Sequence, residues 1–147
     1  MMIDPQQAQE LIVDVCQKVI LNLAKESKID AHNLNVRIDL QNPTAMPVFA
    51  LYDKSQFIDK RTIKEIISAG AEDIPAMFRN QLIIPIKDVI ASIFTAALTR
   101  YESADTKELF VLLYIVENTP TMAIYKNYRR MDSAPVSELI GVGNGNA

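Results

Sequence analysis

The sequence contains very little glycine, and this scarcity excludes several classes of nucleotide-binding protein. Only four of the 147 residues are glycine, and three of these lie within the last seven residues. Phosphate-binding loops need several glycines so that backbone N–H groups can close around the anion. Gly70, the one remaining glycine, cannot form such a loop by itself. The sequence therefore contains neither a P-loop nor a dinucleotide-binding fingerprint.

Cysteine and histidine are also scarce, because the chain has one of each, and it has no tryptophan. One cysteine cannot form an internal disulfide or a thiolate metal site, and Cys16 falls within an apolar stripe, so we expect it in the core. His32 lies close to Asp30 in a predicted loop, but no nucleophile is marked for it to activate. The acidic residues show no metal-ligand spacing. We therefore predict no catalytic residue, no metal site, no cofactor and no enzymatic activity.

Charged residues form no long run of one sign, and the formal net charge is −3. The pI near 5.1 argues against a simple electrostatic nucleic-acid binder, which is usually basic overall. Residues 1–5 lack the basic segment of a signal peptide. No uninterrupted apolar run reaches the ~18–20 residues of a bilayer span. We expect a protein of a reducing cytoplasm, bacterial or viral origin included, with no membrane partner.

Apolar periodicity predicts a long amphipathic helix near the N-terminus. Asp4 suits an N-cap and Pro5 the first helical position, and apolar residues then recur at helical spacing up to Ala24. Val13 and Leu21 fall on the polar side of this helix. We therefore predict that these two residues belong to an interface rather than to the core stripe.

Alternating and doubly apolar segments predict two β-hairpins. Residues 34–40 alternate strictly between apolar and polar, and residues 48–52 are apolar on both faces. Residues 108–117 are apolar, β-branched and aromatic on both faces, which is typical of a central strand. After a turn, residues 122–131 return as the partner strand.

The segment between the hairpins predicts further helices. Helical spacing covers residues 59–69, Gly70 is placed to end that helix, and residues 73–75 begin another. A third apolar pattern runs from Pro85 to Tyr101. Pro85 is expected to break or kink the helix there, because it lacks an N–H donor.

The order helix, hairpin, helices, hairpin predicts an α+β fold in one domain, residues 1–132. We expect a four-stranded, mainly antiparallel sheet built from two hairpins, with the long amphipathic helices packed chiefly on one face. The strand at 109–116 should be central, and residues 34–40 should lie nearer an edge. Residues 133–147 should form a C-terminal segment with a short docked turn and then a flexible tail.

The C-terminal segment contains one candidate contact element. Val136, Leu139 and Ile140 have the i, i+3, i+4 spacing of one helical turn. We predict that this turn docks on its own domain or on a neighbouring subunit, and we count its three residues with the candidate interface.

A basic and aromatic cluster lies in the last predicted strand, and it consists of Tyr125, Lys126, Tyr128, Arg129 and Arg130. Strict alternation would place Lys126, Tyr128 and Arg130 on one face and Tyr125 and Arg129 on the other. Aromatic rings interleaved with cations suit stacking of unpaired bases combined with phosphate contacts. The alternative is an edge strand whose charges prevent unwanted pairing.

Two functions of different classes are compatible with these features. The first is a non-enzymatic assembly, scaffolding or adaptor protein that contacts a protein partner and self-associates, with a homodimer favoured. Its support is surplus apolar surface at Val13, Leu21 and the doubly apolar strands 48–52 and 109–116. The alternative is a module that binds single-stranded RNA or DNA through strand 122–131, with Arg37 assisting.

Overall fold

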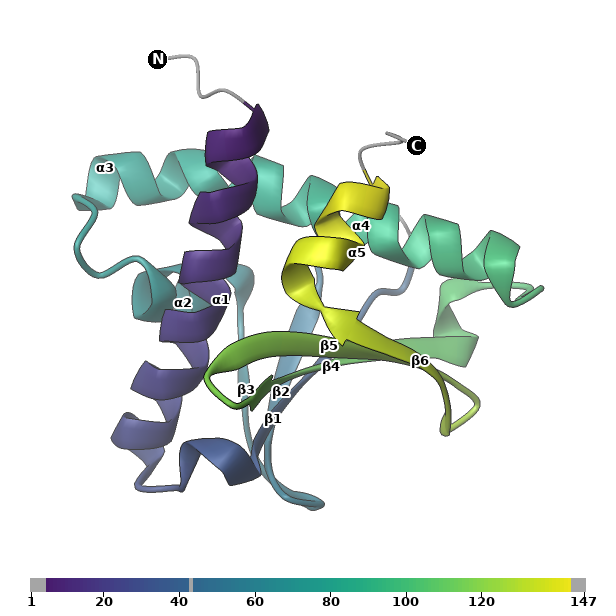
Figure 1. Cartoon of the computed structure of the whole chain (residues 1–147), viewed down its shortest axis with the longest axis horizontal. Coiled ribbons are helices and arrows are strands. Elements are labelled where there is room, and N and C mark those ends of the chain that lie inside the picture. Colours follow the sequence, from purple (N-terminus) through teal and green to yellow (C-terminus); the bar gives the residue numbers. More distant parts are fainter. Residues whose placement is uncertain (1–4, 43, 144–147) are drawn as a thin grey trace.

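The computed structural model describes residues 5–42 and 44–143 as an α+β fold, which confirms the predicted class. The helices are α1 (Pro5–Ser27), α2 (Ile63–Gly70), the single-turn α3 (Ala76–Arg79), α4 (Ile83–Arg100) and α5 (Val136–Gly143), with 3-10 turns η1 (Ala31–Asn33), η2 (Asn80–Leu82) and η3 (Thr106–Glu108). The strands are β1 (Leu34–Asp39), β2 (Val48–Asp53), β3 (Gln56–Arg61), β4 (Leu109–Val116), β5 (Thr119–Lys126) and β6 (Arg129–Pro135) (Figure 1).

The sheet has six strands in the described residues, so the prediction of four strands is wrong. Its order is β3-β2-β1-β4-β5-β6 and every neighbouring pair is antiparallel. Each predicted hairpin is in fact a three-stranded meander. The two additional strands, β3 and β6, form the two edges of the sheet. Their side chains are mostly exposed, so they lack the apolar alternation from which strands are predicted.

The turns that lead into the edge strands contain no glycine. Lys54 has a φ of 56°, and Asn127 and Tyr128 have φ values of 50° and 67°. In the β5–β6 turn, both central residues, Asn127 and Tyr128, have left-handed backbone, which is typical of a type I′ hairpin turn. Asparagine is common in such turns, whereas tyrosine is unusual. The prediction of one strand over residues 122–131 is therefore wrong. In the structure β5 ends at Lys126 and β6 begins at Arg129.

The centre of the sheet also differs from the prediction. β4 is central, as expected, but β1 pairs with both β2 and β4, so residues 34–40 do not lie nearer an edge. The chain thus consists of two similar halves, each a helix, a three-stranded meander and an eight-residue helix. The two halves join where β1 pairs with β4.

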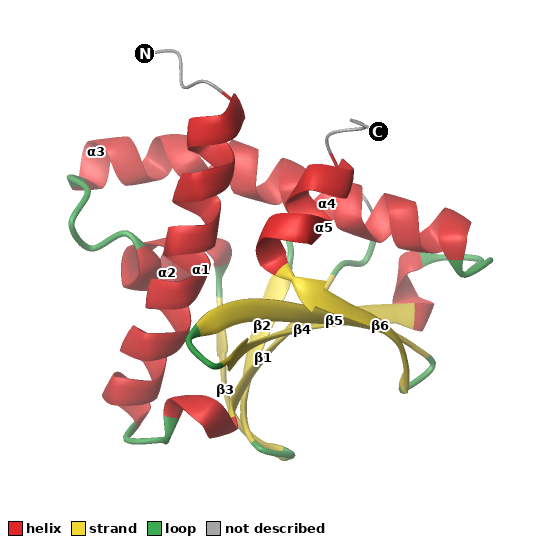
Figure 2. Cartoon of the chain, in the orientation of Figure 1, coloured by secondary structure: helices red, strands yellow, loops and turns green. Residues whose placement is uncertain are grey.

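The helices α1, α2, α4 and α5 lie on one side of the sheet (Figure 2). Val19, Ile20 and Leu23 of α1 are fully or almost fully buried and belong to one core cluster with the inward side chains of the strands. Phe94 of α4 and Val136 of α5 are buried in the same cluster. β6 continues past residue 132, and the chain enters α5 directly at Val136.

Helical residues continue from α3 through η2 into α4. Ala76–Arg100 is long and apolar enough to cross a membrane by length and composition, with a mean hydropathy of 1.7 over 18 residues. Lys87 and Asp88 interrupt the apolar run of this segment, so the sequence contains no uninterrupted apolar stretch of this length. One such helix is weak evidence for a membrane span, since core helices meet the same criterion, and Phe94 is buried in the core.

The helix continues through Pro85 instead of ending there. α4 begins at Ile83, so Pro85 lies in its first turn. The N–H groups of a first helical turn have no intrahelical acceptor, and the missing donor of proline is therefore tolerated there.

Candidate interaction site on the open face of the sheet

The side of the sheet opposite the helices carries apolar and aromatic side chains, and we call it the open face. Ala50, Phe110 and Ala123 are buried, yet they do not belong to the core cluster between helices and sheet. Paired residues of a sheet lie on the same face. The strand registers therefore assign to the open face Val48, Ala50, Tyr52, Phe57, Lys60, Arg37, Phe110, Leu112, Tyr114, Ala123, Tyr125 and Arg130, together with the polar residues Asn35, Asp39, Thr121 and Ser133.

An aromatic cluster occupies one end of the open face. The rings of Phe110 and Tyr125 are stacked, with centroids 4.8 Å apart and planes at 5°. Tyr128, from the β5–β6 turn, packs on Phe110 with centroids 5.6 Å apart. Arg37 places its guanidinium 4.1 Å from the centroid of Phe110, a cation–π distance. Tyr128 keeps 76% of its surface exposed.

A second aromatic pair lies at the β2–β3 end of the open face. Tyr52 and Phe57 meet edge to face, with centroids 5.7 Å apart. Phe57 is 49% exposed, and Val48 and Ile58 are also exposed. Large apolar side chains are therefore exposed on the outer strands as well as around the aromatic cluster.

Arg37 is the charged group at the centre of the open face, and Asp39 neutralises it. Arg37 donates from Nε to Oδ2 of Asp39 over 3.0 Å and from Nη2 to Oδ1 over 3.1 Å. Partial burial lowers the pKa of Arg37, but the hydrogen bonds and charge of Asp39 raise it, and the net result is a raised pKa. Arg37 therefore stays a cation that is already paired within the chain.

The predicted basic and aromatic cluster is divided between the two faces of the sheet. Tyr125 pairs with Arg130, and Tyr128 reaches the same open face. Lys126 pairs with Arg129. The predicted alternation, which grouped Lys126 with Tyr128 and Arg130, is therefore wrong, because a turn separates the two strands.

Lys126 has a structural role in this arrangement. Its Nζ donates a hydrogen bond of 2.8 Å to the carbonyl oxygen of Tyr101, at the end of α4. The phenol of Tyr101 in turn donates to Asp132 of β6 over 3.3 Å. Lys126 therefore joins the sheet to a helix and does not point to the open face.

The five predicted interface residues do not share one surface. Val13 is half-buried against the core, whereas Leu21 is 41% exposed on the outer side of α1. Val136 is completely buried and Leu139 packs partly against the core, so this turn docks on its own chain. The side chain of Ile140 lies outside the described residues.

Cys16 and His32 offer no marked reactive group. Cys16 packs against the core, and burial raises the pKa of its thiol to about 12. His32 is exposed, and its backbone N–H donates to Asp30 over 2.9 Å while its ring nitrogen lies 3.0 Å from the same carboxylate. These contacts, with the backbone hydrogen bond as the largest cause, lower the pKa of Asp30. In the part of the chain that the structure describes, no three His, Cys, Asp or Glu side chains form a metal-binding cluster.

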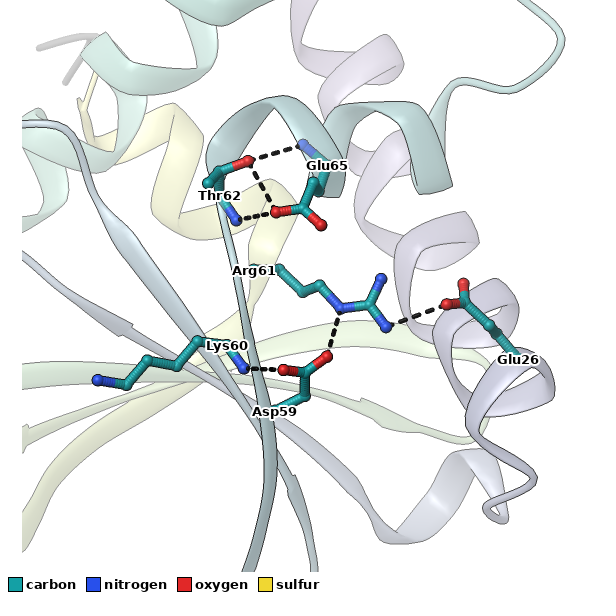
Figure 3. A network of polar contacts seen from close by, with 6 residues as sticks. All are labelled: Glu26, Asp59, Lys60, Arg61, Thr62 and Glu65. Atoms are coloured by element: carbon teal, nitrogen blue, oxygen red, sulfur yellow. Dashed lines mark hydrogen bonds and ion pairs between the residues drawn. The ribbon is translucent and has the colours of Figure 1, made fainter.

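A polar network joins β3 to α1 and begins α2 (Figure 3). Arg61 contacts Glu26 at 3.0 Å and Asp59 at 3.2 Å, and the hydrogen bond to Glu26 is the main reason that its pKa is raised. Thr62 and Glu65 form a reciprocal capping box at the start of α2. This network fixes the end of β3 against the helices.

No family model matches the chain, and searches of curated proteins and of solved structures give no match either.

Proposed function

We propose that this protein is a non-enzymatic assembly, scaffolding or adaptor protein that self-associates through the open face. The observation that carries the proposal is a sheet with helices on one side only. Its other side carries aromatic and aliphatic side chains that are buried or half-buried along the centre and exposed at Val48, Phe57 and Tyr128. Apolar surface on a sheet face that no helix covers favours a protein interface. The doubly apolar strands noted in the sequence are those that supply it.

The size of the open face suits a protein partner. Six strands about 4.8 Å apart and about 3.3 Å of rise per residue give a face of roughly 24 by 20 Å. This projected area is roughly 480 Å², compared with the ~800 Å² that a standard interface buries on each partner, so the strand edges and turns around the face would have to contribute to the interface as well.

A second copy of the chain is the partner we favour. Two-fold homodimers bring the same patch of both subunits together and are the commonest oligomers. Arg37 is neutralised by Asp39 within each chain, whereas Lys60 and Arg130 lie on the two edge strands. The charges without an ion-pair partner among the described residues thus lie at the rim, while the centre combines aromatic and aliphatic groups with the Arg37–Asp39 pair.

Light scattering coupled to size exclusion tests this proposal with single charges placed on the face. Leu112→Lys and Tyr114→Lys should leave the fold intact, because both side chains are only half-buried in the single chain. In a dimer each would bury an unpaired charge, which costs several kcal/mol and raises the dissociation constant at least 100-fold. Ser92→Lys, on the exposed side of α4, is the matched control and should not change the mass. Equal masses for all four proteins would contradict the proposal.

A specific observation supports single-stranded nucleic acid as the second candidate ligand. Tyr128 is highly exposed beside the stacked Phe110 and Tyr125, and Arg130 lies on the same face. Exposed rings on an antiparallel sheet can stack unpaired bases, and nearby arginines can contact phosphate.

Fluorescence anisotropy with a labelled single-stranded oligonucleotide distinguishes the two candidates. Nucleic-acid binding predicts that log affinity falls with log salt by about 0.7 per phosphate contact. Tyr128→Ala with Arg130→Ala should remove the binding, whereas Lys107→Ala, an exposed lysine of η3, should leave it unchanged. Absence of binding at low salt would eliminate this candidate and leave self-association as the function of the face.

A further inference from the structure

A groove separate from the aromatic cluster lies where the loop after β1, the end of β3 and the start of α2 meet. Its volume is about 490 Å³, within the ~300–1,000 Å³ range of ligand-binding clefts. Its apolar lining comes from Met46, Pro47, Val48, Ile63 and Ile83. Ile63 is buried at its base, whereas Met46 is 54% exposed at its margin.

The charged residues around the groove differ in whether they already have ion-pair or hydrogen-bond partners within the chain. Arg61 already contacts Glu26 and Asp59, and Glu65 accepts hydrogen bonds from Thr62 in the capping box. Figure 3 shows the side chain of Lys60 pointing away from that network.

Lys60 and Lys64 both line the groove and are both exposed. Within residues 5–42 and 44–143, neither lysine forms an ion pair. The groove therefore combines an apolar base with two cations that have no carboxylate partner.

A small hollow next to the groove adds a third cation. Lys64 and Ile83 line both spaces, and Arg79 lines the hollow. The Nε atom of Arg79 is buried and has no hydrogen-bond acceptor among the described residues. The hollow measures only about 10 Å³, which is room for one water molecule, so Arg79 adds positive charge beside the groove but no direct contact to a ligand.

Exposed apolar side chains follow directly on the same segment of chain. Met77 and Ile84 are each 69% exposed, and Phe78 is also exposed. Phe78 precedes Arg79 and Ile84 follows Ile83 in the sequence, so these exposed apolar side chains belong to α3 and the start of α4. Methionine side chains adapt readily to partners of different shape.

We propose that this groove binds a segment of a partner protein that presents apolar side chains between aspartates or glutamates. The apolar residues would occupy the space over Ile63 and Ile83, and the carboxylates would pair with Lys60 and Lys64. This assignment rests on the charge complementarity of the groove with an acidic segment. The groove borders the open face, because Val48 and Lys60 belong to both surfaces, but the proposal does not require self-association.

Two other ligands fit the groove less well. The lining contains no aromatic ring on which a base could stack, and this disfavours single-stranded nucleic acid. A strongly basic segment would meet uncompensated lysines and be repelled.

Selection from a random peptide-display library against the full chain tests the proposal. We expect the selected peptides to be enriched in Asp and Glu together with Leu, Ile, Val or Phe. Lys64→Glu and Met46→Asp should each weaken their binding at least tenfold. Both residues are exposed, so neither change should affect folding, which circular dichroism would verify.

Matched variants separate this site from the rest of the surface. Lys107→Glu, which makes the same charge change far along the sequence in η3, should leave peptide binding unchanged. Tyr114→Lys on the open face should also bind the peptides normally, even where it abolishes self-association. A selection that yields no peptides, yields basic peptides, or yields peptides that bind Lys64→Glu as well as the unchanged chain would overturn the proposal. Displacement of the peptides by a single-stranded oligonucleotide would overturn it too.

Discussion

Gly70 lies where α2 meets α1, and we predict that Gly70→Ala destabilises the protein. A Cβ atom at this position would lie 2.5 Å from Cγ2 of Val19, 2.6 Å from the carbonyl oxygen of Val15 and 2.7 Å from Cγ1 of Val15. Carbon atoms essentially never approach other heavy atoms so closely. Rotation of a side chain cannot move the backbone oxygen, so the two helices would have to separate locally.

The expected magnitude follows from two opposing effects. Additional atoms in a well-packed interior cost about 1–3 kcal/mol, and the contact with backbone places this site near the upper end. Alanine is favoured over glycine in helices by up to about 1 kcal/mol, which offsets part of the cost. We therefore expect the free energy of unfolding to fall by about 2 kcal/mol.

Urea denaturation followed by circular dichroism measures this loss. With an m-value of about 2 kcal/mol/M, the midpoint should fall by roughly 1 M at unchanged m. Ser68→Ala, on the exposed side of α2, is the control and should change stability by no more than about 0.5 kcal/mol. A Gly70→Ala protein as stable as the unchanged chain would refute the close approach of the helices.

Three further predictions concern caps, thiol reactivity and the C-terminal helix. Thr62→Ala removes the hydroxyl that accepts from the backbone N–H of Glu65 over 3.2 Å, so urea denaturation should show a loss of about 1 kcal/mol. Burial raises the pKa of the Cys16 thiol to about 12. Ellman's reagent at pH 8 should therefore label the native protein far more slowly than the protein in denaturant. Equal labelling rates would contradict this burial. Val136 is completely buried, so Val136→Ala should lower the free energy of unfolding by about 2 kcal/mol in urea denaturation, and an unchanged midpoint would contradict the docking of α5.

The sequence predicts the buried parts of this fold better than its exposed parts. The stripe that contains Val19 and Leu23 has helical period, and the doubly apolar segment at 109–116 correctly marks a central strand. The prediction of a helix over 59–69 is wrong at its start, because residues 59–61 belong to β3 and α2 begins at Ile63. β3 and β6 were not recognised as separate edge strands, because most of their side chains are exposed. Apolar periodicity, the main signal of secondary structure, is absent from such strands.

Long-range pairing explains the remaining differences. The position of β1 at the centre of the sheet depends on its pairing with β4. Val36, for example, pairs with Leu113, which lies about 77 residues away in the chain. Local sequence patterns do not encode such a contact. The same pairing brings Arg37 onto Phe110. The doubly apolar strands 48–52 and 109–116 were predicted to supply surplus apolar surface, but the position of Arg37 between them was not, because the two halves meet only in the folded sheet.

The native mass of the unmodified chain tests the central proposal most directly. Sedimentation equilibrium over roughly 1–100 μM spans the concentrations at which a standard interface of this size would form. Self-association through the open face predicts that the mass rises from that of one chain, 16.5 kDa, to twice this value within the range. A single-chain mass at every concentration would contradict it.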